Sequence, residues 1–122
     1  MESERKFFEI AKKLSKKSTY VHQLGAVITK KNKIVGMGFN NPYKTHPQSN
    51  NDFKNIHAEL DAILDVENKK DLQGSVLYVY REHKNGQPAN SKPCKYCKML
   101  IKKAGIKKVY YTNNGTYEEY DV

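Results

Sequence analysis

The sequence predicts a layered α/β fold over residues 1–122, with a mixed sheet of about five strands between two layers of helices. Amphipathic helical segments alternate with short apolar strands along the chain, and an antiparallel hairpin leads the sheet. A chain of 122 residues has the size of one compact domain with one hydrophobic core. We therefore expect a single domain with a three-layer α/β/α sandwich.

The first half of the chain predicts a helix, a hairpin and a long loop. Residues Glu4 to Lys17 favour an amphipathic helix, because apolar residues recur at helical spacing and lysines fill the other face. Two short strands follow, from Leu24 to Thr29 and from Ile34 to Phe39, and the three residues Lys31-Asn32-Lys33 between them predict a turn. The polar stretch from Asn40 to Ile56 has no clear period, and loops of that size in small domains are often functional.

The next segment predicts a helix, a central strand and a second polar loop. A helix is expected over residues 56–67, with Leu60 and Ile63 among its inward residues. The continuous apolar run over 76–80 is typical of a strand that is buried on both faces. The polar stretch over 82–93 then predicts a loop, with a turn at Asn85-Gly86.

The last third predicts a helix and a terminal hairpin. A helix is expected over residues 94–104, with Gly105 as its C-terminal cap. A strand is expected over 107–111. Asn114-Gly115 is a strong hairpin signal, so residues 116–122 are expected to pair back as the last strand.

The composition excludes several classes of protein. No apolar run approaches the roughly 18 residues that a membrane span needs, and the N-terminus has no secretion-signal pattern. The two cysteines, separated by two residues, make a poor structural disulfide and fit a reducing compartment. We therefore expect a cytoplasmic protein without a membrane partner. The net charge of +9 fits a phosphorylated or polyanionic partner and, equally, a lysine bias that favours solubility.

Two short segments contain the residues that predict chemistry, His57-Ala58-Glu59 and Pro93-Cys94-Lys95-Tyr96-Cys97. A catalytic zinc ion takes three protein ligands and keeps one open position, and His57, Cys94 and Cys97 supply three ligands at two predicted helix starts. The positive ends of these helices help to keep thiols deprotonated. Glu59 then stands beside the ion, where its carboxylate can act as general base and general acid. This set predicts hydrolytic deamination at an amidine-like carbon.

Each segment alone also fits a simpler interpretation. A C-x-x-C pair is typical of redox pairs and of half of a zinc knuckle. Most His-x-Glu pairs lie on the surface by chance and have no functional role. A zinc-stabilised binding module would use the same three ligands, but it would not need the Glu59 carboxylate. The two segments occur in this order, each begins a predicted helix, and a predicted buried strand lies between them. This combination favours the catalytic interpretation. The other histidines, His22, His46 and His83, have no partner pattern and are expected on the surface.

From Leu24-Gly25-Ala26-Val27-Ile28 to Tyr111, the chain resembles the cytidine deaminase-like superfamily. H-x-E followed by P-C-x-x-C is that family's zinc signature, and Gly38-Phe39-Asn40 extends the match. The stretch from Lys98 to Tyr111 is similar to deoxycytidylate deaminases, whereas the expected terminal hairpin is more similar to free-nucleoside cytidine deaminases. The resemblance implies that Zn²⁺ is the cofactor, that His57, Cys94 and Cys97 bind it, and that Glu59 is the catalytic residue.

The resemblance also implies substrate contacts. Asn40 would contact the sugar and the backbone amide of Ala58 the base, while the backbone at Ser91 would line the pocket near the amino group and Leu24 its wall. The implied activity converts a cytosine nucleoside or nucleotide (cytidine, deoxycytidine or dCMP) to its uracil form and releases ammonia. A family member of this size is expected to form a homo-oligomer.

A second class of substrate is a base within a nucleic acid, such as single-stranded DNA, single-stranded RNA or tRNA. The net charge of +9 and the aromatic residues Tyr43, Phe53 and Tyr117 favour it, because exposed aromatic rings stack on bases. The scarcity of arginine, with only Arg5 and Arg81 in the chain, disfavours it. Salt-sensitive binding to oligonucleotides would separate the two classes.

Overall fold

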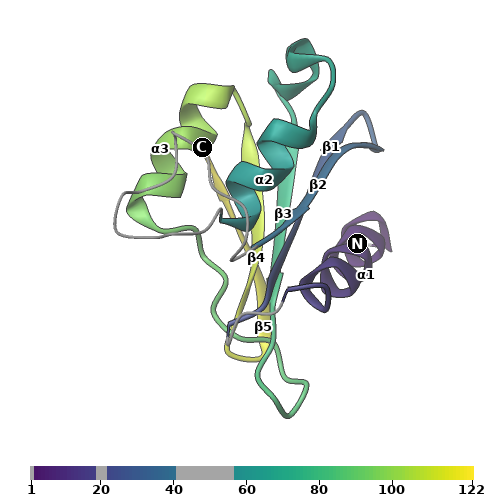
Figure 1. Ribbon diagram of the computed structural model, residues 1–122, viewed down its shortest axis with the longest axis vertical. Coiled ribbons are helices and arrows are strands. Elements are labelled where there is room, and N and C mark those ends of the chain that lie inside the picture. Colours follow the sequence, from purple (N-terminus) through teal and green to yellow (C-terminus); the bar gives the residue numbers. More distant parts are fainter. Residues whose placement is uncertain (1, 19–21, 41–56) are drawn as a thin grey trace.

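The computed structural model describes residues 2–18, 22–40 and 57–122. Within them, α1 covers one face of a five-stranded sheet, and α2 and α3 cover the other face (Figure 1). The elements are α1 (Glu2–Ser15), β1 (Leu24–Lys30), β2 (Lys33–Phe39), α2 (Ala58–Asp65), η1 (Lys69–Leu72), β3 (Val76–Arg81), α3 (Lys95–Ala104), β4 (Lys108–Asn113) and β5 (Thr116–Asp121). The predicted three-layer α/β fold is confirmed. The predicted loop over 41–56, with Tyr43 and Phe53, lies outside the described residues.

The sheet is mixed and has the order β2-β1-β3-β4-β5. β1 is antiparallel to both β2 and β3, β3 is parallel to β4, and β4 is antiparallel to β5. Both predicted hairpins are therefore confirmed. The first one turns through Lys31 and Asn32, whose φ angles of 52° and 62° place both in the left-handed region, so this turn has two residues rather than the three expected.

β3 separates two apolar layers. The side chains of Leu77 and Val79 lie in the core beneath α2 and α3, whereas Tyr78 and Tyr80 lie in the core beneath α1. Because successive side chains of a strand point to opposite faces, the strand is buried on both faces as predicted. The same alternation places Arg81, the last residue of β3, on the face of α2 and α3.

Close contact between α2 and the edge strand β2 fixes the position of α2. A Cβ atom at Gly38 would lie 2.4 Å from the backbone nitrogen of Ala62, and one at Gly36 would lie 2.5 Å from the Ala62 carbonyl oxygen. In addition, the Asp61 carboxylate accepts a hydrogen bond of 3.2 Å from the backbone N–H of Phe39. The glycines and this hydrogen bond hold α2, and hence its first turn, against the sheet.

α2 is shorter than the predicted helix over 56–67. It begins at Ala58, because His57 has an extended backbone with φ −73° and ψ 152°, and it ends before Val66, which is also extended. The buried residues of α2 are Ala58, Glu59, Leu60, Asp61 and Ala62. Leu60 is inward as predicted and Ile63 packs partly against the core, but the apolar pattern did not predict that two carboxylates are buried.

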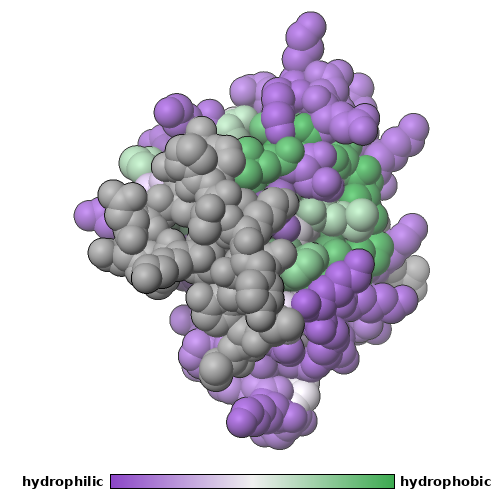
Figure 2. Space-filling view, viewed as in Figure 1, coloured by the Kyte–Doolittle hydropathy of each residue, from purple (hydrophilic) through white to green (hydrophobic). Residues whose placement is uncertain are grey.

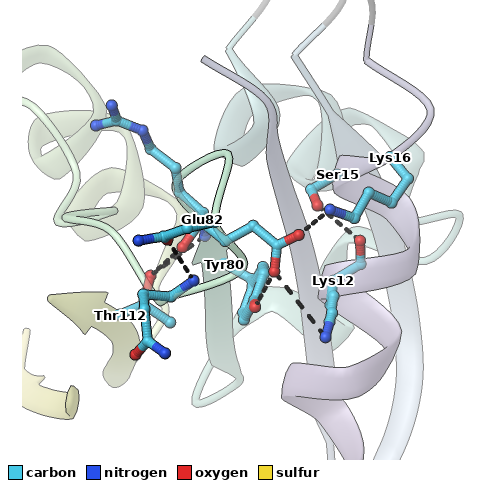
Figure 3. Close-up of polar contacts among 9 residues, drawn as sticks. Lys12, Ser15, Lys16, Tyr80, Glu82 and Thr112 are labelled. Carbon is cyan, nitrogen blue, oxygen red and sulfur yellow. Dashed lines mark hydrogen bonds and ion pairs between the residues drawn. The ribbon is translucent and has the colours of Figure 1, made fainter. Parts of the chain in front are cut away.

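α1 is anchored to the end of β3 through Glu82, whose side chain is only 10% exposed. The Tyr80 hydroxyl donates a hydrogen bond of 2.6 Å to the Glu82 carboxylate. Lys16 also contacts that carboxylate, and Lys12 lies 4.0 Å from it (Figure 3). The Glu82 carboxylate thus makes its contacts on the α1 face of the sheet.

Hydrophilic side chains cover much of the surface in the view of Figure 2, apart from a hydrophobic area beside α2 and the β1–β2 hairpin. On β2, the side chains of Ile34 and Met37 are 37% and 43% exposed. None of the helices in the described ranges is long and apolar enough to cross a membrane.

Candidate active site

The structure brings His57, Cys94 and Cys97 together. One ligand atom from each of the three residues lies within 4.8 Å of the other two. His57 is the N-cap residue of α2, and its side chain makes no capping hydrogen bond. Cys94 is the N-cap residue of α3, and its sulfur accepts the backbone N–H of Cys97 at 3.5 Å. The N-termini of two helices therefore meet at one point, as the sequence predicted.

The distances fit a tetrahedral metal site. The Nδ1 atom of His57 lies 3.2 Å from the Sγ atom of Cys97 and 3.9 Å from the Sγ atom of Cys94. Nitrogen and sulfur ligands of tetrahedral zinc are separated by about 3.5 Å, given Zn–N and Zn–S bonds of about 2.0 and 2.3 Å. One imidazole and two thiols is also a donor set that zinc prefers. These three residues therefore fit a three-ligand zinc site.

Burial shapes the electrostatics of the three ligands. It lowers the pKa of His57, which favours the neutral imidazole that metals bind. Burial raises the pKa of the Cys97 thiol, and the neighbouring charges of Glu59 and Cys94 raise it further. In the metal-free protein the Cys97 thiol therefore keeps its proton, and metal binding must release it.

Glu59 lies next to this cluster in the first turn of α2, and its side chain is only 4% exposed. Burial raises the pKa of Glu59 to about 7, although hydrogen bonds to the backbone and to the Cys97 side chain act in the opposite direction. A carboxyl group with a pKa near neutrality can both take up and release a proton at physiological pH. This environment suits a general acid and base.

Three other residues singled out in the sequence lie around the strand ends and the start of α2. Ala58 is the first residue of α2, where a backbone N–H has no acceptor within the helix. The Asn40 amide is buried, accepts the backbone N–H of Leu24 at 2.9 Å and donates to the His22 carbonyl oxygen at 2.6 Å. Leu24 packs against the core beneath α2 and α3. Asn40 thus already links β2 to the start of β1.

Ser91 is buried and belongs to a hydrogen-bond network in front of the cysteines. Its hydroxyl donates to the Val79 carbonyl oxygen at 2.9 Å and accepts the backbone N–H of Thr112 at 2.7 Å. Its own N–H donates to the Thr112 carbonyl oxygen at 2.8 Å. The side chain and N–H of Ser91 therefore position the loop that leads to Cys94.

Two residues beside the site were not predicted from the sequence. The Thr112 hydroxyl, 2.8 Å from that of Ser91, is part of the loop network. The hydroxyl of Tyr120 is buried without a hydrogen-bond partner among the residues that the structure describes. Burial, followed by the charge of Glu59, raises the pKa of Tyr120 to about 12, so its hydroxyl lies within the electrostatic reach of the site. Neither residue belongs to a motif, because both are positioned by the pairing of β4 with β5.

Comparisons with known sequences agree with this geometry. Residues 1–113 match the family model of the cytidine and deoxycytidylate deaminase zinc-binding region. The chain is 38% identical over 95 residues to an uncharacterised deaminase from the luxG 3′ region of Aliivibrio fischeri, covering 72% of this chain and 56% of that protein. It is 32% identical over 106 residues to deoxycytidylate deaminase of Homo sapiens, covering 75% and 53%. The chain thus spans about half the length of these curated relatives.

Solved structures show the same fold. The crystal structure of dCMP deaminase from the cyanophage S-TIM5 in its apo form is 30% identical, with a TM-score of 0.70, and the match covers 92% of this chain and 83% of that one. The cytidine deaminase of Burkholderia pseudomallei has a TM-score of 0.70 at 19% identity, over 96% and 91% of the two chains, and this likeness shows the fold alone. On the match of the family model to residues 1–113, the chain belongs to the cytidine and deoxycytidylate deaminase family.

Proposed function

We propose that this protein is a zinc-dependent hydrolase that deaminates a cytosine nucleoside or nucleotide to its uracil form and releases ammonia. The observation that carries the proposal is the meeting of one imidazole and two thiols within 4.8 Å, beside the buried carboxyl group of Glu59. Membership of the deaminase family supports the same reaction.

His57, Cys94 and Cys97 would hold the ion. Zinc supplies Lewis acidity, which makes water a nucleophile near neutral pH. The N-termini of α2 and α3 favour the negative charge of the two sulfurs. Two thiolates balance the charge of the ion, so the site does not bury a net charge.

Glu59 would move the protons. It takes one proton from the attacking water and gives it to the ring nitrogen, and it then moves the second proton from the added hydroxyl to the leaving amine, so that cytosine and water give uracil and ammonia. The buried position of Glu59 keeps solvent from competing for these protons. Its pKa of about 7 suits a group that must be reprotonated in every cycle.

The remaining contacts would orient the base and the sugar. The backbone N–H of Ala58 is available to a base, and the carbonyl oxygen of Ser91 would face the amino group that leaves. The Asn40 amide would contact the sugar with the hydrogen-bonding capacity that remains beyond its bonds to Leu24 and His22. Leu24 would form part of the pocket wall.

A small-molecule substrate is favoured over a nucleic acid. The human relative is a deoxycytidylate deaminase, and a phage dCMP deaminase that is 27% identical to this chain has been crystallised with dCMP and dUMP. The one predicted base-stacking residue that the structure describes, Tyr117, contacts Phe8 of α1 with ring centroids 4.8 Å apart. Tyr117 therefore lies on the α1 face, opposite the cluster.

The direct test is a panel of substrates with zinc-loaded protein. Uracil product and ammonia would be measured with cytidine, deoxycytidine, their monophosphates and a cytosine within a single-stranded oligonucleotide. We expect turnover of at least one small substrate. Zinc-loaded, folded protein that releases ammonia from none of them would contradict the proposed function, and turnover of the oligonucleotide alone would identify the alternative substrate class.

We also infer that residues 1–122 act as one catalytic domain in the cytoplasm and that the domain forms a homo-oligomer. Ile34 and Met37, exposed on the edge strand β2, support self-association, because exposed apolar side chains at the edge of a sheet favour contact with another chain. Replacing both residues by glutamate is expected to lower the mass measured by light scattering. An unchanged mass would place any contact between copies elsewhere.

A further inference from the structure

Arg81, at the end of β3, is a cation held by neutral groups. Its Nη1 atom donates to the backbone carbonyl oxygen of Asn90 at 3.1 Å, and its Nη2 atom lies 2.8 Å from Nδ1 of His22. Within the described ranges 2–18, 22–40 and 57–122, the ion pairs of the structure do not include Arg81. The guanidinium group is therefore fixed in place, and no carboxylate of the described residues balances its charge.

The neighbouring acid does not supply that balance. Glu82 follows Arg81 in the chain, but its carboxylate points toward α1, where it contacts Lys12, Lys16 and the Tyr80 hydroxyl (Figure 3). The alternation of β3 places Arg81 on the opposite face, with α2 and α3. The positive charge of Arg81 thus lies on the face that holds the metal ligands.

A chain of hydrogen bonds connects Arg81 with both sides of the proposed site. On one side, Asn40 donates to the carbonyl oxygen of His22 at 2.6 Å, and the His22 ring contacts Arg81. On the other side, Arg81 donates to the Asn90 carbonyl oxygen, and the Asn90 side chain accepts the backbone N–H of Lys92 at 3.0 Å, two residues before Cys94. Arg81 therefore lies between the residue proposed for the sugar and the turn that carries the cysteines.

The chemistry of this group selects an anion. A guanidinium group has five N–H donors in a planar fork that matches phosphate, and Arg81 uses two of them. The Nδ1 atom of His22 accepts the hydrogen bond from Arg81, so a neutral His22 ring carries its proton on Nε2. This Nε2–H group is a second donor next to the guanidinium group. A nucleotide substrate would bring a phosphate group to this position, because its phosphate is bonded directly to the sugar.

We propose that Arg81 and His22 form the subsite for the 5′-phosphate of the substrate, which makes the protein a deaminase of a cytosine nucleoside monophosphate rather than of the free nucleoside. This inference rests on the proposed function. The fork of Arg81 binds two phosphate oxygens, and the bonds to Asn90 and His22 keep it oriented before the substrate arrives. Arg81 and His22 thus determine specificity and take no part in the bond-breaking step.

The test compares dCMP with deoxycytidine in zinc-loaded wild-type protein and in the Arg81→Gln variant. The measured quantity is the ratio of kcat/KM for dCMP to kcat/KM for deoxycytidine. We expect this ratio to exceed one in the wild type and to fall about 10- to 100-fold in Arg81→Gln, because a hydrogen-bonded charge pair is lost. His22→Gln should lower the ratio by a smaller factor. Arg5→Gln is the matched control, since Arg5 is an exposed residue of α1 and the only other arginine.

Each other outcome has a distinct meaning. A fall in both kcat/KM values by the same factor would overturn the inference, because Arg81 would then be only a structural residue. A wild-type protein that prefers deoxycytidine would also overturn it. Neither result would contradict the proposed deaminase function. Turnover of neither substrate, together with no turnover of cytidine or its monophosphate, would contradict the proposed function instead. Calorimetry with dUMP and deoxyuridine would then decide the inference: equal affinities would overturn it, and tighter dUMP binding that Arg81→Gln abolishes would support it. If Arg81→Gln fails to fold, His22→Gln and Arg81→Lys give the same comparison.

Discussion

The Nδ1 atom of His57 lies 3.2 Å from the Sγ atom of Cys97, although the two residues are 40 positions apart in the chain. The contact exists because α2 and α3 both begin at the same end of the sheet, where the carboxyl ends of the parallel strands β3 and β4 meet. The position of α2 against β2 and the loop before α3 therefore control the distance between the ligands.

Gly38→Ala should destabilise the protein and reduce its activity. A Cβ atom at this position would lie 2.4 Å from the backbone nitrogen of Ala62 and 2.8 Å from the carbonyl oxygen of Ala58, and backbone atoms cannot yield as a flexible side chain can. We expect the free energy of unfolding, measured by urea denaturation, to fall by about 2 kcal/mol. Met37→Ala, at an exposed neighbouring position, is the control and should change it by much less. Equal effects of both variants would show that α2 does not depend on this close contact.

Thr112→Val should loosen the loop in front of the cysteines while preserving the shape of the side chain. The Thr112 hydroxyl lies 2.7 Å from the Ala89 carbonyl oxygen and 2.8 Å from the Ser91 hydroxyl, all in the interior. Its removal leaves buried polar groups without a partner, which costs about 1–3 kcal/mol of stability. Zinc affinity should fall as well, because the loop leads to Cys94. Thr116→Val, at an exposed position, is the control, and an equal loss in both variants would contradict this role.

Tyr120→Phe should stabilise the fold, whereas the two substitutions above should destabilise it. The hydroxyl of Tyr120 is buried without a partner in the part of the chain that the structure describes, so the native state gains nothing from it. Phenylalanine keeps the ring and removes the desolvation cost, and we expect the free energy of unfolding to rise by about 1 kcal/mol. Tyr117→Phe should leave it unchanged, since the Tyr117 side chain is 56% exposed. A clear loss of stability in Tyr120→Phe would mean that this hydroxyl does bond in solution.

Much of the site could be predicted from the sequence, because its residues lie at helix starts, which are recognisable from the neighbouring sequence. His57, Cys94 and Cys97 stand at two helix starts, and the residues that open a helix are recognisable from the periodic segment that follows. The strands and both hairpins follow from apolar runs and turn residues for the same reason. The continuous apolar run of β3 also predicted that this strand is buried on both faces, which places the helices on either side of it.

The supports of the site could not be predicted, because they depend on the pairing of distant strands. His22 is exposed as expected, yet its contact with Arg81 follows from the register that sets Leu24 opposite Arg81. The burial of Asp61 likewise follows from the position of β2, whose edge N–H groups need acceptors. A pattern of apolar residues identifies an inward face, but it does not indicate which polar residues the interior will satisfy.

Glu59→Gln should stabilise the metal-free protein at high pH but not at low pH. The pKa of Glu59 is raised to about 7 in the folded state from an ordinary value of 4.5, so folding keeps the proton on, and stability falls as the pH rises between these two values. Above pH 7 the variant should be more stable by about 3 kcal/mol, whereas near pH 4 the two proteins should be equal. Urea denaturation with a chelator at both pH values would measure this difference. Glu67→Gln, an exposed control, should show none, and a gain for Glu59→Gln that is the same at both pH values would refute the assignment to charge.

The central claim is that three side chains hold one zinc ion and that Glu59, which does not bind the ion, moves the protons. The most direct measurement is zinc content together with deaminase turnover for the wild type and Glu59→Gln, purified in the same way. We predict one zinc per chain in both proteins and turnover in the wild type alone. Turnover that survives in Glu59→Gln, or wild-type protein that is fully active after its metal has been removed, would contradict the claim.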